Sequence, residues 1–163
     1  MPVRRARESD LPAVFDSFER TAAEGKWIGS ELPLDRTDRI ARWRDFIAGT
    51  EGVMLVAEVD GEIVGGSSLQ WIGHCGTGLL GLGMWLDAPY RGRGLGTALL
   101  TESITWAKDN GAHKITLEVW PHNDAALALY RRFGFEQEGY LRGNWRRRNG
   151  ELWDSIVMGL LLE

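Results

Sequence analysis

The sequence predicts an α/β (α+β) fold in which a mixed central sheet carries helices on both faces. Segments of alternating and helical periodicity follow one another as strand, two helices, three strands, helix, strand, helix and two strands. Glycine accounts for 21 of the 163 residues and clusters at 61–66, 73–83 and 92–96, which indicates tight turns and bulges rather than linkers. A chain of this length buries about 70% of its unfolded surface. We therefore expect one domain, residues 1–163.

The first half is predicted to contain, in order, a strand at Val3–Arg7, helices at Leu11–Glu24 and Asp35–Ala48, and strands at Val53–Val59 and Glu62–Trp71. Ser9-Asp10 is expected to cap the first helix and Gly25 to end it. Residues 26–33, which include Trp27, are predicted to form a loop. Asp60-Gly61 has the composition of a hairpin turn.

The second half is predicted to contain a strand at Leu79–Leu86, a helix at Gly94–Asn110, a strand at Lys114–Val119, a helix at Asp124–Phe133, and closing strands at Phe135–Asn144 and Glu151–Leu161. Gly111 and Gly134 stand at helix ends, where a left-handed residue is common. Asn149-Gly150 is the expected turn of the last hairpin.

Composition excludes several functional classes. The chain has 19 basic and 23 acidic residues, a net charge of −4, which argues against a nucleic-acid surface. No apolar run approaches the roughly 20 residues that a membrane span requires, and no leader pattern is present. Cys75 is the single cysteine, and His74, His113 and His122 fall outside zinc spacings, so no metal is expected. A cytoplasmic, reducing location follows.

The segment Arg91–Leu99 is the most informative part of the chain. It places a glycine-rich basic turn directly before a helix, where free N–H groups and the positive end of the helix dipole favour a phosphate. A solvated basic turn is the alternative. Residues 76–81 also spell the G-x-G-x-x-G dinucleotide fingerprint, but a strand pattern follows where a helix is required, so we reject that site. No Walker loop is present.

The spacing of Arg91, Gly94 and Gly96 resembles the acyl-CoA pyrophosphate loop of the GCN5-related N-acetyltransferase (GNAT) superfamily. Residues 83–100 look like that superfamily's central strand, loop and helix, and residues 117–135 resemble its next strand and helix. The resemblance implies a mostly antiparallel sheet of about seven strands, splayed in the middle, with acetyl-CoA as co-substrate.

The end of the chain is similar to the branch that acts on ribosomal-protein N-termini, polyamines and free amino acids. The similarity rests on Glu138-Gly139, Arg142, Asn149-Gly150-Glu151 and Asp154.

The resemblance also implies a cofactor site, made of the loop residues Arg91, Gly92, Arg93, Gly94, Leu95, Gly96 and Thr97, the strand residues Met84, Trp85 and Leu86, and Asn123. In the superfamily a bulge in the strand parts it from its neighbour, here residues 114–119, and leaves backbone groups unpaired. The pantetheine arm can add to this free edge, and an N–H of residues 84–86 can act as an oxyanion donor. Close packing is the alternative reason for the glycines at 81 and 83.

Tyr130 and Glu118 are implied in catalysis, and Asn123 in cofactor binding. Asn123 and Tyr130 lie two turns apart on one helical face, so both can line one extended ligand. The resemblance assigns Asn123 to the pantetheine arm and Tyr130 to the general acid beside the CoA sulfur; a helix cap and a core tyrosine are the alternatives. Glu118 is the candidate base that accepts the proton of an amine, with a structural salt bridge as its alternative.

Trp27, Trp71, Trp120 and Trp145 are candidates for the walls of an acceptor pocket. Arg142 and Arg146–Arg148 could bind a carboxylate or phosphate, although a solvated hairpin is favoured.

We therefore expect an acetyl-CoA-dependent N-acetyltransferase that acts by direct attack on a small-molecule or peptide amine. A non-catalytic acyl-CoA sensor and a transferase with a non-amine acceptor remain open. A homodimer is also open.

Overall fold

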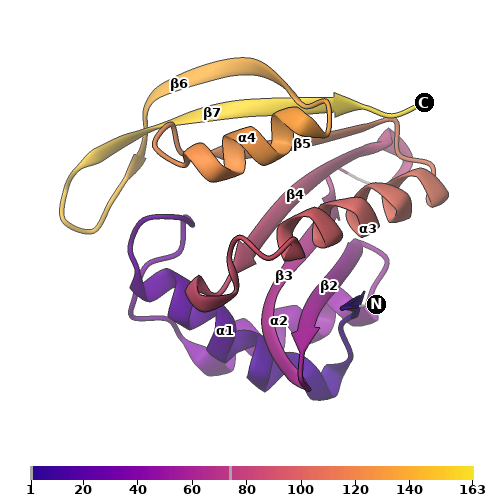
Figure 1. Ribbon diagram of the computed structural model, residues 1–163, viewed down its shortest axis with the longest axis vertical. Helices are drawn as coiled ribbons and strands as arrows, with labels where there is room; N and C mark the ends of the chain where they lie inside the picture. The colour runs from indigo at the N-terminus through magenta and orange to yellow at the C-terminus, as the bar shows by residue number, and fades with distance from the viewer. Residues whose placement is uncertain (1, 74) are drawn as a thin grey trace.

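The computed structural model describes residues 2–73 and 75–163, and one seven-stranded sheet organises them (Figure 1). The strand order is β1-β2-β3-β4-β5-β7-β6. All neighbouring strands are antiparallel except β4 and β5, which are parallel. The predicted mixed, mostly antiparallel sheet is confirmed. His74, which was expected to have no role, lies outside the described residues.

The strands are β1 (Val3–Arg5), β2 (Gly52–Val59), β3 (Glu62–Trp71), β4 (Leu79–Leu86), β5 (Lys114–Val119), β6 (Glu136–Arg146) and β7 (Leu152–Leu161). The α-helices are α1 (Leu11–Ala23), α2 (Arg36–Ala48), α3 (Leu95–Asp109) and α4 (Asp124–Arg132), and short 3-10 helices lie at Glu8–Asp10, Cys75–Thr77 and Ala88–Tyr90. The predicted elements are therefore all present, with ends displaced by at most two residues.

The two faces of the sheet are covered by different helices. On one face, α1 and α2 pack over Met54, Val56 and Trp85. On the other face, α3 and α4 enclose the larger apolar core, which includes Leu80 and Ile115 from the two parallel strands. The strands and these helices thus form three layers, with β4 and β5 at the centre of the sheet.

The predicted cap of α1 is wrong. The Asp10 carboxylate makes no capping hydrogen bond to α1; it accepts from both terminal nitrogens of Arg4, at 2.7 and 3.0 Å, and from the backbone N–H of Arg7. These donors hold the pKa of Asp10 below its usual value, the Arg4 hydrogen bond contributing most. The carboxylate therefore secures the link from β1 to α1. Asp35 does cap its helix, α2, by accepting from the N–H of Asp38.

Two predicted turns depend on left-handed backbone. Asp60 and Gly61 have φ of 51° and 81°, as the tight β2–β3 hairpin requires. Gly111 has φ of 81° where α3 ends.

Within the described ranges, no helix is long and apolar enough to cross a membrane. Those ranges also contain no group of three or more His, Cys, Asp or Glu side chains that could hold a metal ion.

Candidate active site

The two central strands, β4 and β5, separate half-way along their length. β4 and β5 pair only at Leu79↔Lys114, Leu80↔Ile115 and Gly81↔Thr116, although β4 continues to Leu86 and β5 to Val119. Figure 1 shows the two strands diverging beyond this point. The predicted splay is confirmed.

The bulge predicted to cause the splay is wrong. The register of β3 and β4 runs without a shift from Trp71↔Leu80 to Gly65↔Leu86. Glycines in β3 permit this close pairing, because a Cβ on Gly65 would lie 2.7 Å from the Trp85 carbonyl oxygen and one on Gly66 would lie 2.5 Å from the Trp85 ring. β4 therefore stays regular against β3, and the gap opens on its β5 side.

Alternation along β4 decides which amides face this gap. Asp87 N–H donates to the Val64 carbonyl on β3, at 2.8 Å. In an antiparallel ladder, hydrogen-bonded and non-hydrogen-bonded pairs alternate, so the Trp85 amide also faces β3, whereas the amides of Met84 and Leu86 point to the opened edge. Of the three predicted oxyanion donors, the geometry leaves Met84 and Leu86.

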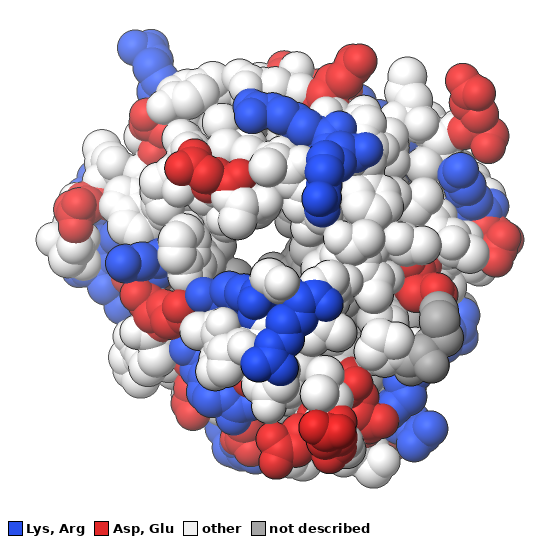
Figure 2. Space-filling model, viewed as in Figure 1, with Lys and Arg blue, Asp and Glu red and all other residues white. Residues whose placement is uncertain are grey.

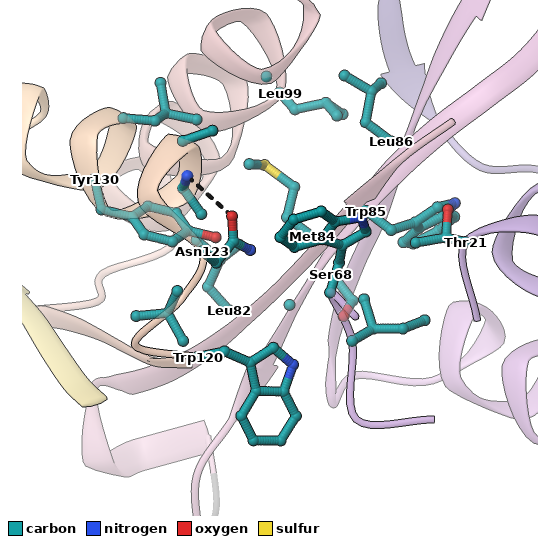
Figure 3. Close-up of a pocket in the computed structure, with 18 of the residues that line it drawn as sticks. Thr21, Ser68, Leu82, Met84, Trp85, Leu86, Leu99, Trp120, Asn123 and Tyr130 are labelled. Atoms are coloured by element: carbon teal, nitrogen blue, oxygen red, sulfur yellow. Dashed lines mark hydrogen bonds between the residues drawn. The ribbon is translucent and has the colours of Figure 1, made fainter. Parts of the chain in front are cut away.

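A cavity of about 810 Å³ occupies the gap and continues to both faces of the sheet. Figure 2 shows the molecule hollowed at its centre, with basic side chains on opposite sides of the opening. In Figure 3, Asn123 and Tyr130 lie on one side of the cavity, Trp85 and Thr21 on the other, and Met84 between them. Most of the lining is apolar, as small-molecule sites usually are.

The predicted phosphate loop forms one end of this cavity. Gly92 and Gly94 have φ of 74° and 83°, and no heavy atom of the described residues, other than those of the glycine and its two chain neighbours, lies within 4 Å of the position that a Cβ would take on either. α3 begins at Leu95, and the first N–H groups of a helix have no partner inside the helix. Open space, free amides and the helix dipole coincide here, which is an arrangement that binds phosphate groups.

The side chains of the loop take different positions. Arg91, Gly92, Gly94, Gly96 and Thr97 line the cavity. Leu95 is in the apolar core, and the Arg93 guanidinium lies 5.2 Å from the Tyr90 ring centroid, outside the lining.

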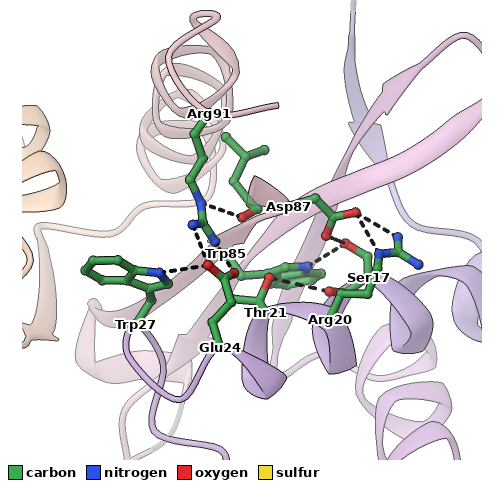
Figure 4. A network of polar contacts seen from close by, with 9 residues as sticks. Ser17, Arg20, Thr21, Glu24, Trp27, Trp85, Asp87 and Arg91 are labelled. Atoms are coloured by element: carbon green, nitrogen blue, oxygen red, sulfur yellow. Dashed lines mark hydrogen bonds and ion pairs between the residues drawn. The ribbon is translucent and has the colours of Figure 1, made fainter. Parts of the chain in front are cut away.

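Arg91 holds the loop in place with its side chain. Its guanidinium makes two hydrogen bonds to the Glu24 carboxylate, at 2.6 and 2.8 Å, and its Nε donates to the Leu86 carbonyl (Figure 4). The Arg91 hydrogen bonds are the main reason that the pKa of Glu24 is lowered. Trp27 also donates to Glu24, so α1, the loop after it and the end of β4 are joined at one point.

Trp85 turns its indole away from the phosphate loop. The indole N–H donates to Ser17 Oγ, which in turn donates to the buried Asp87 carboxylate, and Arg20 completes the network (Figure 4). The ring also contacts Phe18 edge to face at 5.4 Å. Although part of Trp85 lines the cavity, its side chain chiefly fixes β4 to α1.

Asn123 and Tyr130 project from α4 as predicted and both line the cavity. The Asn123 side-chain oxygen caps α4 by accepting from the Ala126 N–H at 3.3 Å, so the alternative role as a cap is present. The amide nitrogen lies at the cavity in Figure 3. Burial raises the pKa of Tyr130 to about 12, so the phenol stays protonated at neutral pH.

Glu118 lies at the end of β5 and lines the cavity. One carboxylate oxygen, Oε1, accepts hydrogen bonds from Ser155 Oγ at 2.8 Å, Asn144 Nδ2 at 3.2 Å and Trp145 Nε1 at 3.3 Å. No ion pair to Glu118 occurs among the described residues, which argues against the structural salt bridge. Three donors orient this carboxylate through one oxygen.

Three of the four tryptophans considered as walls, Trp27, Trp120 and Trp145, line the cavity, whereas Trp71 packs against Trp106 beneath α3.

The prediction that the arginines of the last hairpin are solvated is wrong for Arg147, whose side chain is buried with 3% exposed. Its guanidinium lies 4.4 Å from the Trp153 ring and donates to the Gly29 carbonyl. Arg148 donates to the carbonyls of Leu32 and Pro33, so the β6–β7 hairpin is joined to the loop between α1 and α2.

The sequence reasoning missed Arg39 and Trp43 from α2, Ser30 from the preceding loop, and Arg132 from α4. Arg132 donates to Thr97 Oγ1 at 3.3 Å and so adds a cation beside the phosphate loop. No spacing in the sequence marks these residues, because their contacts join distant elements.

Comparison with known proteins identifies the family. Residues 14–135 match the model of the acetyltransferase (GNAT) family. The chain belongs to this family. This acetyltransferase is also 32% identical over 136 residues to an acetyltransferase of Pectobacterium atrosepticum, covering 83% of this chain and 88% of that one.

Solved structures of similar fold include a ribosomal-protein-alanine N-acetyltransferase from Brucella melitensis, with 28% identity, a TM-score of 0.89, and coverage of 99% of this chain and 100% of that one. Another, yncA from Salmonella typhimurium, was solved with acetyl-CoA; at 23% identity, a TM-score of 0.88 and coverage of 99% and 93%, it supports the fold. Acetyl-CoA is the co-substrate of the family and of this acetyltransferase. The Cβ-free space at Gly92 and Gly94 suits its diphosphate.

Proposed function

We propose that this acetyltransferase transfers the acetyl group of acetyl-CoA directly to a primary amine. The observation that carries the proposal is the continuity of the cavity: it runs from the phosphate loop, past the opened edge of β4, to Glu118 and Tyr130. One extended thioester can thus bind at the loop and present its carbonyl carbon to a nucleophile beside a carboxylate.

The reaction begins with the acceptor, because an alkylammonium has a pKa near 10.4 and its lone pair is occupied until a proton leaves. Glu118 accepts this proton directly or through a water molecule. The amine nitrogen then attacks the thioester carbon, and the N–H of Met84 or Leu86 stabilises the negative oxygen that forms.

Collapse of this tetrahedral intermediate breaks the carbon–sulfur bond and releases CoA thiolate, while the amine nitrogen gives its second proton to solvent water and becomes the neutral amide nitrogen. Tyr130 donates its phenolic proton, or a hydrogen bond, to the sulfur. With the Tyr130 pKa at about 12 and a thiol near 8.5, full proton transfer is uphill by about 5 kcal/mol, so hydrogen-bond stabilisation of the thiolate is the larger contribution.

Thiol release from acetyl-CoA in the presence of amino acids, polyamines and N-terminal peptides tests the proposal. We expect amine-dependent release of CoA together with an N-acetylated product identified by mass spectrometry. CoA binding without turnover would favour the sensor, and an O-acetylated product would favour a non-amine acceptor.

The Glu118→Gln variant refines this test. Glutamine keeps the shape of the side chain but cannot take the amine proton. We expect a loss of turnover of about 100-fold with unchanged CoA affinity. The homodimer and the cytoplasmic location stay predictions, which light scattering and cell fractionation would check.

A further inference from the structure

Arg39 lines the cavity, and its guanidinium has few polar partners. It lies on α2, and its guanidinium is 5.1 Å from the Phe18 ring centroid and 5.7 Å from that of Trp43. Its one hydrogen bond within residues 2–73 and 75–163 is a long contact from Nη2 to Ser30 Oγ, at 3.4 Å. Its Nε is buried and has no hydrogen-bond partner.

The other arginines of α2 show that this is unusual. Arg36 pairs with Asp16 at 2.6 Å, Arg42 with Asp38 at 2.9 Å, and Arg44 with Glu8 at 2.8 Å. Over the described part of the chain, no carboxylate oxygen lies within 4.0 Å of the Arg39 guanidinium. Of the four arginines on α2, the one that faces the cavity is the one without an acidic partner.

An unpaired guanidinium in an apolar wall is costly, because burial disfavours its charged form. Burial, followed by the charge of Arg42, lowers the pKa of Arg39, and the opposing influence of Asp38 is smaller. Asp38 is already engaged by Arg42. The described residues thus supply no carboxylate to Arg39, and a bound ligand can supply one.

Charges along the cavity indicate which ligand supplies it. Arg132 lies beside the phosphate loop and Arg91 is neutralised by Glu24, so neither competes for the acceptor. Glu118 is the one acidic residue among the described residues of the lining. The acceptor region thus offers one carboxylate, on β5, and one free guanidinium, on α2.

We propose that the acceptor is an amine that also carries a carboxylate, the amino-acid class, and that Arg39 binds this acidic group while Glu118 faces the amine. Guanidinium groups bind carboxylates through paired hydrogen bonds, and Phe18 and Trp43 provide an apolar surface for the rest of the molecule. This assignment rests on the proposed amine acetylation. It selects amino acids over polyamines, whose cations Arg39 would repel.

Three acceptors that share the leucine side chain test the assignment: L-leucine, L-leucinamide and 3-methylbutylamine, which lacks the carboxylate. We expect the wild-type kcat/KM to be highest for leucine. In Arg39→Met, whose side chain retains packing against the rings, the value for leucine should fall 10- to 100-fold and that for 3-methylbutylamine by less than 3-fold. For each acceptor, the kcat/KM of Arg39→Met is divided by that of the wild type. Comparing this ratio for leucine with the ratio for 3-methylbutylamine cancels the different basicities of the amines.

The matched control is Arg44→Met, an exposed neighbour on the same helix that pairs with Glu8, which should leave all three values unchanged. Arg39→Lys should restore part of the leucine activity. An equal loss for every acceptor, or a wild-type preference for 3-methylbutylamine, would overturn the assignment.

Calorimetric titration of leucine into the CoA-bound enzyme separates this assignment from the proposed function. Leucine binding that Arg39→Met weakens at least 10-fold supports the carboxylate site even if no amine is acetylated, a result that would reject only amine acetylation. Leucine binding that is undetectable, or that is the same in wild type and Arg39→Met, contradicts the carboxylate site.

Discussion

At the scale of single residues, the cavity separates side chains that hold the site together from those that face the ligand. Arg91 and Trp85 were both predicted to contact the cofactor, yet their polar groups bind Glu24 and Ser17. Tyr130 directs its hydroxyl to the cavity, and Glu118 lines the cavity as well. Residue type and position predicted which residues gather here, but the partner of an arginine or a tryptophan depends on elements far away in sequence.

The Tyr130→Phe variant tests the role of the phenol. Removing the hydroxyl should lower kcat by about 100-fold, because the departing thiolate loses its donor, and should leave the Kd of CoA within a factor of two. Stopped-flow turnover and calorimetry provide the two measurements. Equal kcat values would remove Tyr130 from the mechanism.

The raised pKa of Tyr130 also predicts a pH dependence of stability. The folded state holds this proton up to about pH 12, whereas the unfolded chain releases it near pH 10. The free energy of unfolding should therefore fall as pH rises from 10 to 12, by up to about 3 kcal/mol from this residue. Denaturant unfolding of wild type and Tyr130→Phe should show a shallower decline in the variant. Stability curves that run parallel against pH in wild type and Tyr130→Phe would refute the raised pKa of Tyr130.

At the scale of elements, the loop and helix Gly92–Asp109 combine a left-handed turn with a helix start. The sequence motif predicted this element because glycines with positive φ and a helix onset are both local properties. The splay of β4 from β5 was inferred from family resemblance. The structure adds that β4 pairs with β3 without a break past Gly65 and Gly66, and these are non-local contacts that periodicity cannot reveal.

Gly94→Asp tests the phosphate loop. The carboxylate would enter the open space at Gly94 and repel the diphosphate, so CoA binding should fall by at least 100-fold by calorimetry. Gly111→Asp is the matched control, because its φ of 81° is close to the 83° of Gly94 and its Cβ position is also free of neighbours.

Both variants should lose about 1–2 kcal/mol of stability from the left-handed backbone. Only Gly94→Asp should lose CoA. Retained affinity in Gly94→Asp would place the diphosphate elsewhere.

At the scale of the whole molecule, the sheet consists of two halves joined at the centre by the short β4–β5 pairing. Arg91 joins α1 to the phosphate loop, and Arg147 and Arg148 join the last hairpin to the loop between α1 and α2. These contacts hold the cavity walls on both halves. The order of elements predicted this architecture, whereas the arginine contacts across it could not be read from one sequence.

The central claim is that acetyl-CoA bridges the two halves by adding to the free edge of β4. Residue-resolved amide exchange by NMR, with and without CoA, tests it most directly. We predict that the amides of Met84 and Leu86 become protected when CoA binds, while those of Trp85 and Asp87, which face β3, are protected in both states. Unchanged exchange at Met84 and Leu86 in the CoA-saturated protein would contradict the claim.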